Sequence, residues 1–250
     1  MKTLIKVGVI AILLIVAAVA VLSFYLDSMI KAGVEAVGPK ITGTAVKLDG
    51  VSLSLLSGQA RLKGLVVGNP PGFQTERSFK LADAKVKVDL KTALSNKLVI
   101  EEILIDGPEI TYEGSSSGSN ISKIQENVTA FGKSVTPKDA AESKSPKKDP
   151  TQKKVQINHF IVKNAQLNAS TSMLKGKTTV SMPDIYLKDI GKDSGGVTVQ
   201  TAATEVFAAI NKSVVQSVSR GAEEAVKSIG SEAEKSSSKA VEGLKGLLGK

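Results

Sequence analysis

The feature that most constrains this chain is a run of uncharged residues near its N-terminus. Residues 7–26 read VGVIAILLIVAAVAVLSFYL, which is 20 positions without a charge. At about 1.5 Å per residue, a helix of this length extends about 30 Å, the thickness of the hydrocarbon core of a bilayer. Lys2 and Lys6 precede the run and Asp27 follows it. By the positive-inside rule, the sequence predicts a single-pass anchor with a cytoplasmic N-terminus and the rest of the chain on the far side.

A cleaved signal peptide is the competing interpretation of the same segment. Ala18-Val19-Ala20 has the small-x-small spacing of a cleavage site. The apolar run continues to Leu26, however, so a cut there would fall inside it, and this favours an uncleaved anchor. Both interpretations place the bulk of the chain outside the cytoplasm, which argues against nucleic acid as a partner despite the net charge of +9.

Composition and motifs argue against an enzyme. The chain has no Cys and one His, which excludes a thiol nucleophile, the usual structural zinc sites and a two-His metal centre. Glu101 and Glu102 are neighbours on a predicted strand, so their side chains are expected on opposite faces. His159 lies in an apolar stretch without a nucleophile and is predicted to be a surface or edge residue. We therefore expect no catalytic residue, no metal and no cofactor.

Alternation of apolar and polar residues dominates the stretch from Thr44 to Glu113. Val51, Leu53 and Leu55 alternate with serines, and Val86 and Val88 alternate with lysines. Such period-two patterning, interrupted at Gly and Pro, is typical of antiparallel strands with one apolar face. The apolar face of such a sheet needs a cover, which can be a second layer, a helix or a bound apolar ligand.

An internal repeat links two parts of the predicted sheet. Residues 99–113 and 155–169 match at an offset of 57 positions, with Gly107-Pro108 aligned with Asn164-Ala165. The matched apolar pairs are Ile100 with Ile157, Ile103 with Phe160, Ile105 with Val162 and Ile110 with Leu167. Each unit is predicted to be a strand, a kink and a returning strand, and stacking of such units would build an elongated sheet.

Three further segments complete the organisation. Residues 28–42 are predicted to form a connector helix that stops at Gly38-Pro39. A weak helix is expected from Asn120 to Phe131, followed by a disordered basic linker over 132–154 with seven Lys and three acidic residues. From Thr198 onward, apolar residues recur at helical spacing, although Gly221, Gly230 and Gly243 are candidate breaks.

The predicted fold class is α+β, with a single N-terminal transmembrane helix, an elongated, antiparallel, partly open β sheet and a long C-terminal amphipathic helix. The expected divisions are 1–27 (cytoplasmic tip and anchor), 28–42 (connector helix), 43–131 (β module), 132–154 (linker), 155–196 (second β segment) and 197–250 (C-terminal helix).

The order of several short motifs resembles the start of AsmA-like proteins. They are Thr42-Gly43, Gly58, Leu62, Leu65, Val67, Asn69-Pro70, Gly72-Phe73, Val86-x-Val88-Asp89 and the stretch from Ile100 to Glu113. The resemblance implies a protein anchored in the inner membrane of an envelope-bearing bacterium, with its bulk in the periplasm. Larger relatives form long β grooves that are thought to conduct phospholipids, and this shorter chain is expected to act locally.

The apolar strand face carries the functional expectation. Its alternating residues could line a groove for phospholipid acyl chains, since burial gives about 0.8 kcal/mol per methylene. The same residues could instead pack against the C-terminal helix in a closed core, and the sequence leaves both possibilities open. A scaffold that recruits a protein partner through residues 198–250 is the alternative function. The candidate lipid-facing residues are Leu53, Leu55, Leu65, Val67, Val86, Val88, Ile103, Ile105, Phe160 and Val162.

Overall fold

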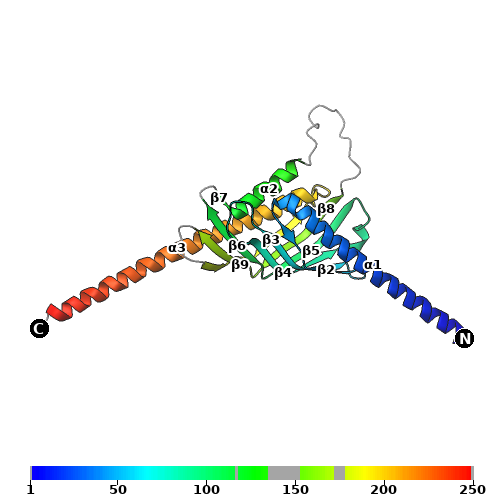
Figure 1. Cartoon of the computed structure of the whole chain (residues 1–250), viewed down its shortest axis with the longest axis horizontal. Helices are drawn as coiled ribbons and strands as arrows, with labels where there is room; N and C mark the ends of the chain where they lie inside the picture. Colours follow the sequence, from blue (N-terminus) through cyan, green and yellow to red (C-terminus); the bar gives the residue numbers. More distant parts are fainter. Residues whose placement is uncertain (1, 116–117, 135–152, 172–177, 249–250) are drawn as a thin grey trace, which may run out of the picture.

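The computed structural model describes residues 2–115, 118–134, 153–171 and 178–248, with side chains for 21–115, 118–132, 153–169 and 179–223 (Figure 1). Most of the predicted linker (135–152) therefore lies outside the described residues. The elements in chain order are α1 (Lys2–Thr42), β1 (Val46–Lys47), β2 (Gly50–Ser54), β3 (Gln59–Gly68), β4 (Arg77–Val88), η1 (Leu90–Thr92), β5 (Lys97–Asp106), β6 (Glu109–Ser115), β7 (Gly118–Ser119), α2 (Asn120–Ser134), β8 (Lys154–Lys163), β9 (Gln166–Thr171), β10 (Thr178–Ser181), β11 (Ile185–Ile190) and α3 (Val199–Leu248).

The N-terminal helix α1 is continuous, and the predicted stop at Gly38-Pro39 is wrong. Pro39 lies inside the helix, which ends at Thr42, where Gly43 adopts φ +71° and its N–H donates to the Pro39 carbonyl at 2.9 Å. This is a left-handed glycine cap, which satisfies a carbonyl of the last turn. The predicted connector helix 28–42 is thus the second half of α1.

Among the residues that the structure describes, no helix combines the length and the apolarity that a membrane crossing requires. Residues 7–20 of the predicted span lie outside the described side chains.

The strands form one mixed sheet, so the expectation of a purely antiparallel sheet is wrong. β3 pairs with β4, and β4 with β5 and β6, in antiparallel register. β5 pairs with β8, and β6 with β9, in parallel register. β10 and β11 close the far edge antiparallel to β9 and β8. Parallel neighbours need a long crossover, which here contains α2.

The parallel pairing places the two copies of the repeat side by side. Ile100 faces Ile157, Ile103 faces Phe160 and Ile105 faces Val162 between β5 and β8. Ile110 faces Leu167 between β6 and β9. The offset of 57 positions is therefore the register of the sheet. The second strand of each unit does not return, however: β5 and β6 both run antiparallel to β4, so each unit is one long strand with a bend.

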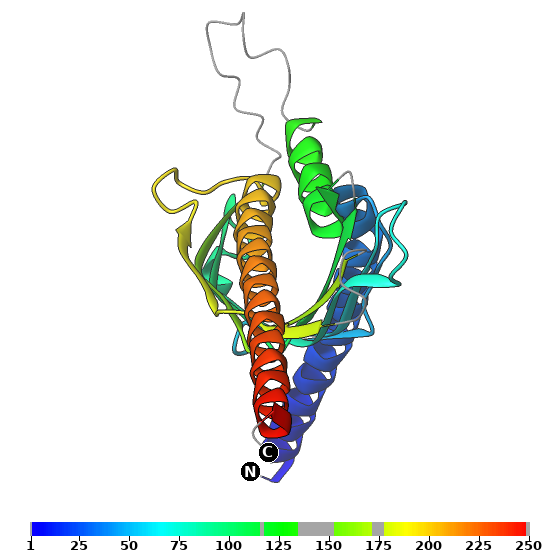
Figure 2. The ribbon, with the colours of Figure 1, turned by 90° about the vertical axis from the view of Figure 1, so that its left-hand side faces the viewer.

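A line of bends curves the sheet into a trough (Figure 2). Gly107 between β5 and β6 has φ +62°, and Asn164 between β8 and β9 has φ +53°. Glycine and asparagine tolerate this left-handed region better than other residues. The Gly107 N–H donates to the Lys163 carbonyl at 2.9 Å, so the two bends are tied to each other.

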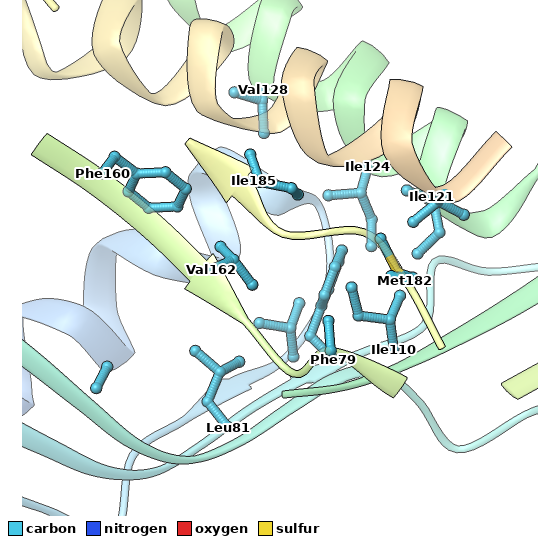
Figure 3. Packing of buried hydrophobic residues seen from close by; sticks show 14 of the residues in the cluster. Phe79, Leu81, Ile110, Ile121, Ile124, Val128, Phe160, Val162, Met182 and Ile185 are labelled. Atoms are coloured by element: carbon cyan, nitrogen blue, oxygen red, sulfur yellow. The ribbon is translucent and has the colours of Figure 1, made fainter. Parts of the chain in front are cut away.

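Helices α2 and α3 lie in the opening of the trough, and the core forms between them and the sheet (Figure 2, Figure 3). Ile121, Ile124 and Val128 of α2 are fully buried. They face a cluster of strand residues that includes Phe79, Leu81, Ile110, Phe160, Val162 and Ile185 (Figure 3). The protein thus combines α+β elements, a large, partly open mixed sheet and a C-terminal helix, and α3 continues without interruption through all three candidate glycine breaks.

Candidate functional site

The register of the sheet brings the candidate lipid-facing residues onto one face. Ala60, Val86, Ile103, Phe160 and Leu187 face one another in a row from β3 to β11. A second row contains Ile105 and Val162, and Leu53 of β2 lies opposite Ala60. Directly opposed residues share a face of a sheet. We call this surface, which lines the trough, the inner face.

Helices cover part of the inner face, and they cover some of the residues predicted to meet lipid. Val67, Phe160 and Val162 are only 7%, 4% and 3% exposed and belong to the hydrophobic core. On α3, Phe207 packs edge-on against Phe79, with ring centroids 6.0 Å apart and an interplanar angle of 85°. For these three residues, packing in a closed core is the arrangement found.

The remaining seven candidates are all partly buried, and they differ in whether they contact the core. Leu65, Ile103 and Ile105 pack against the core cluster. Four others are not part of that cluster: Leu53, Leu55, Val86 and Val88. We call these four residues the open apolar strip. The sequence predicted that these residues share a face, but it could not show which of them a helix covers. The apolar-polar alternation of a strand is the same whether or not a helix packs on it.

Polar contacts hold α1 against the sheet next to the open apolar strip. The Leu53 N–H donates to Asp27 Oδ1 at 2.8 Å, and the Leu48 N–H donates to Glu35 Oε1 at 3.0 Å. Lys31 donates to the Leu48 carbonyl and to Glu35, the latter at 2.9 Å. The hydrogen bond from the Leu48 N–H, followed by that from Lys31, lowers the pKa of Glu35. These contacts fix the direction in which α1 leaves the sheet.

A polar network that sequence reasoning missed joins the turn after β3 to the start of α2. Asn120 is fully buried, and its Nδ2 donates to Asn69 Oδ1 at 2.8 Å and to the Thr111 carbonyl at 2.7 Å. Asn120 Oδ1 accepts from the Glu113 N–H at 2.9 Å. The available signal was an Asn directly before the apolar positions of a helix, a favoured cap residue.

Glu113 closes the same region from the opposite side. Its carboxylate accepts hydrogen bonds from the Gln74 N–H, the Thr75 N–H and Thr75 Oγ1, at 2.8, 2.8 and 2.7 Å. Burial favours the neutral acid, but these three donors outweigh it, and the pKa of Glu113 is lowered. Two parts of the motif series, the turn that starts at Asn69-Pro70 and the segment ending at Glu113, therefore meet in space.

A comparison with protein families shows which family the chain belongs to. The model of the AsmA family matches residues 1–230, which is most of the chain. The chain belongs to the AsmA family. Neither a curated protein nor a solved structure matches it. In this AsmA-family protein, the motif residues named in the sequence analysis include the turn after β3, its anchor Glu113 on β6, and the first bent strand of the repeat, β5 with β6.

The outer, convex face of the sheet carries the charged groups. Lys87 Nζ lies 2.7 Å from Glu101 Oε2, and this hydrogen bond raises the pKa of Lys87. Glu102 faces Lys87 in the sheet register, and the bulge at Glu101 brings this acid beside the same lysine, so the prediction that the two side chains lie on opposite faces is wrong. A depression of about 390 Å³ here is lined mostly by Gln59, Arg61, Lys85, Lys87 and Glu102.

His159 lies 3.5 Å from the Tyr186 hydroxyl. Among the residues searched, no three His, Asp or Glu side chains cluster as metal ligands.

Proposed function

We propose that this protein is a non-enzymatic, membrane-anchored envelope protein that binds or shields phospholipid acyl chains on the open apolar strip. In this proposal, residues 7–26 cross the bacterial inner membrane once and the sheet lies in the periplasm. The observation that supports it most is the uneven cover of the inner face: α2 and α3 bury one part, while Leu53, Leu55, Val86 and Val88 stay partly exposed beside α1. Membership of the AsmA family is consistent with such a role.

Physical chemistry favours an acyl chain as the occupant of the strip. Burial of a methylene contributes about 0.8 kcal/mol, so contact with several methylenes suffices for measurable binding. The strip offers no buried cation or metal cluster of the kind that a polar small molecule would require. Because α3 occupies much of the trough, the strip suits partial contact with a chain near the membrane rather than passage through a long groove.

The test compares two charge substitutions at adjacent positions on β4. Val86→Glu puts a carboxylate on the open apolar strip, and Lys85→Glu puts one on the outer face. The full chain is purified in mild detergent, and its phospholipid is extracted and quantified by mass spectrometry. We expect Val86→Glu to retain at least severalfold less phospholipid per chain than Lys85→Glu, because charging the strip removes the apolar contact.

Equal phospholipid retention by the two variants would contradict the proposal. Circular dichroism and a denaturant midpoint close to that of the unsubstituted chain serve as the control for folding. The substitution at residue 86 is expected to be tolerated because that side chain is already partly in contact with solvent.

A scaffold function for the C-terminal helix remains a second proposal. The described side chains of α3 pack in the trough as far as Val218, whereas its backbone continues to Leu248, beyond the sheet (Figure 1). A chain that ends at residue 223 keeps the packed part of α3. If the distal part of α3 recruits a partner, this truncated chain should still fold and retain phospholipid. It should, however, lose a protein partner that in-cell crosslinking captures with the full chain. Capture of the same partner by both chains would contradict the scaffold function.

A further inference from the structure

Three leucines are exposed at one end of the trough. Leu56, in the turn between β2 and β3, is 90% exposed; Leu90 and Leu94, in the connection from β4 to β5, are 41% and 99% exposed. The two connections are neighbours, since the Val88 N–H donates to the Gly58 carbonyl at 2.9 Å. Neighbouring exposed leucines at loop tips are unfavourable in water and indicate an interaction site.

These leucines lie at the end of the sheet from which α1 leaves. Along α1, Val46 packs beside Gly38, Leu48 contacts Lys31 and Glu35, and Leu53 contacts Asp27. The strand segment from β1 to β2 therefore runs antiparallel to the helix, and Leu56 falls level with residues that precede Asp27. There α1 extends past the sheet (Figure 1), and its exposed side chains include Val21, Leu22, Phe24 and Tyr25, in the last part of the uncharged run.

Lysines surround the exposed leucines. Lys91 is exposed on η1, and Lys153 Nζ donates to the Ala93 carbonyl at 2.6 Å. Strand β8 starts at the same end, since the Lys154 N–H donates to the Asn96 carbonyl at 2.9 Å. In three described segments at this end, 89–97, 153–154 and 189–193, the charged groups are five lysines (Lys91, Lys97, Lys153, Lys154 and Lys192) and three acids (Asp89, Asp189 and Asp193). Asp89 caps η1, and Asp189 is paired with Lys192.

We propose that this end of the sheet docks on the bilayer that α1 crosses, with Leu56, Leu90 and Leu94 inserted at the boundary between headgroups and acyl chains. Lysines beside the inserted leucines would contact anionic headgroups, the combination that holds peripheral proteins on membranes. A lipid surface fits better than a protein partner, because the patch continues the apolar surface of α1 and carries excess positive charge. The inference rests on the proposed membrane anchor and adds a second, independent contact.

Docking would bring the open apolar strip to the membrane surface. Val88 is separated from Leu90 of η1 by a single residue, and Leu55 directly precedes Leu56. With these loops inserted, an acyl chain would reach Val86 and Val88 without crossing water.

Single tryptophans can test the docking, because the chain contains none. Leu56→Trp and Leu94→Trp place the probe in the two loops, and Tyr186→Trp places a control at a half-exposed position on β11. The full-length variants are reconstituted into vesicles of phosphatidylethanolamine and phosphatidylglycerol that carry bromine on the upper acyl chain. We expect emission of the two loop probes to shift to shorter wavelength and to be quenched severalfold more than that of the control.

Flotation of the same samples on a density gradient separates this inference from the proposed anchor. Vesicles that carry the chain but leave both loop probes no more quenched than the control would overturn the docking and leave the anchor intact. A chain that fails to float would overturn both. In vesicles without phosphatidylglycerol, the quenching of Leu94→Trp should weaken, because the lysines lose their anionic partners. Unchanged quenching would contradict the proposed contact between the lysines and anionic headgroups.

Discussion

At the scale of residues, a few buried polar side chains fix the turns around the sheet. Asn120, the first residue of α2, is hydrogen-bonded to the distant turn after β3, to strand β6 and to the next residue of α2 itself. A buried amide of this kind is stabilising only while all its partners are present, since each unsatisfied group costs about 1–3 kcal/mol.

Asn120→Ala is therefore expected to lower the free energy of unfolding by about 2–3 kcal/mol, because it leaves the Thr111 carbonyl and the Glu113 N–H without their partner. Asn96→Ala, at an exposed position, is the matched control and should change stability by less than about 0.5 kcal/mol. Denaturant unfolding of the detergent-solubilised chain measures both. Similar midpoints for the two variants would contradict this role for Asn120.

Glu113 makes stability depend on pH in a defined direction. Its pKa is lower in the folded chain than in the unfolded chain, so its contribution is complete above about pH 4.3, the ordinary value for Glu, and is lost as the pH falls through the folded value. Replacement by Gln should weaken the hydrogen bonds to Gln74 and Thr75 at neutral pH and make stability fall less steeply between about pH 5 and pH 3. Parallel acid profiles for the two chains would show that Glu113 does not contribute.

At the scale of elements, α3 determines how much of the inner face is accessible. Val214 is fully buried, and Phe207 contacts Phe79 in the middle of the sheet. Helix formation in α3 gains from this packing, because isolated helices with many Ser and Gly residues are only marginally stable. The helix is thus both a structural part of the core and the boundary of the open apolar strip.

Phe207→Ala should lower the free energy of unfolding by about 2–4 kcal/mol, since it removes an aromatic contact and leaves a cavity over Phe79. Val215→Ala, one of the exposed positions on the same helix, is the control and should have an effect below about 0.5 kcal/mol. Thermal and denaturant unfolding distinguish the two. A small effect of Phe207→Ala, comparable with the control, would mean that α3 does not hold the core closed.

The sequence allowed the elements to be predicted better than their pairing. The period-two pattern located the strands, and the offset of 57 positions matched residues that turned out to be parallel neighbours, such as Ile103 and Phe160. The prediction that the second strand of each unit runs back along the first was wrong, because Gly107-Pro108 is as typical of a tight turn as of a bend. Parallel pairing joins segments far apart in the chain, and no local pattern reports it.

The sequence predicted that the candidate residues share one face of the sheet, but it did not predict which part of that face stays uncovered. Alternation placed Val86, Phe160 and eight other residues together, and the register supports this for the nine that lie in strands, all except Leu55. Helical spacing in α3 indicated that this helix has an apolar partner, but it could not show which strands the helix covers. The division into buried core and open apolar strip depends on where α3 crosses the trough, which is a property of tertiary packing.

At the scale of the whole molecule, a long N-terminal helix, a curved sheet and a partial helical cover are joined in one chain (Figure 2). α1 passes directly into contacts with β2, and α2 and α3 fill the opposite part of the trough (Figure 1, Figure 2). The open apolar strip lies on β2, β4 and the turn after β2, and its Leu53 is hydrogen-bonded to α1 through Asp27. In the proposed function, this arrangement keeps one apolar surface at the membrane while the rest of the sheet folds as an ordinary core.

Photocrosslinking with a phospholipid that carries a diazirine on its acyl chain tests the central claim most directly. The full chain is illuminated in native membranes, digested and mapped by mass spectrometry. The account predicts lipid adducts on peptides that contain Leu53, Val86 and Val88, in addition to those from residues 7–26, and a loss of the adducts around residue 86 in Val86→Glu but not in Lys85→Glu. Adducts confined to residues 7–26 would contradict it.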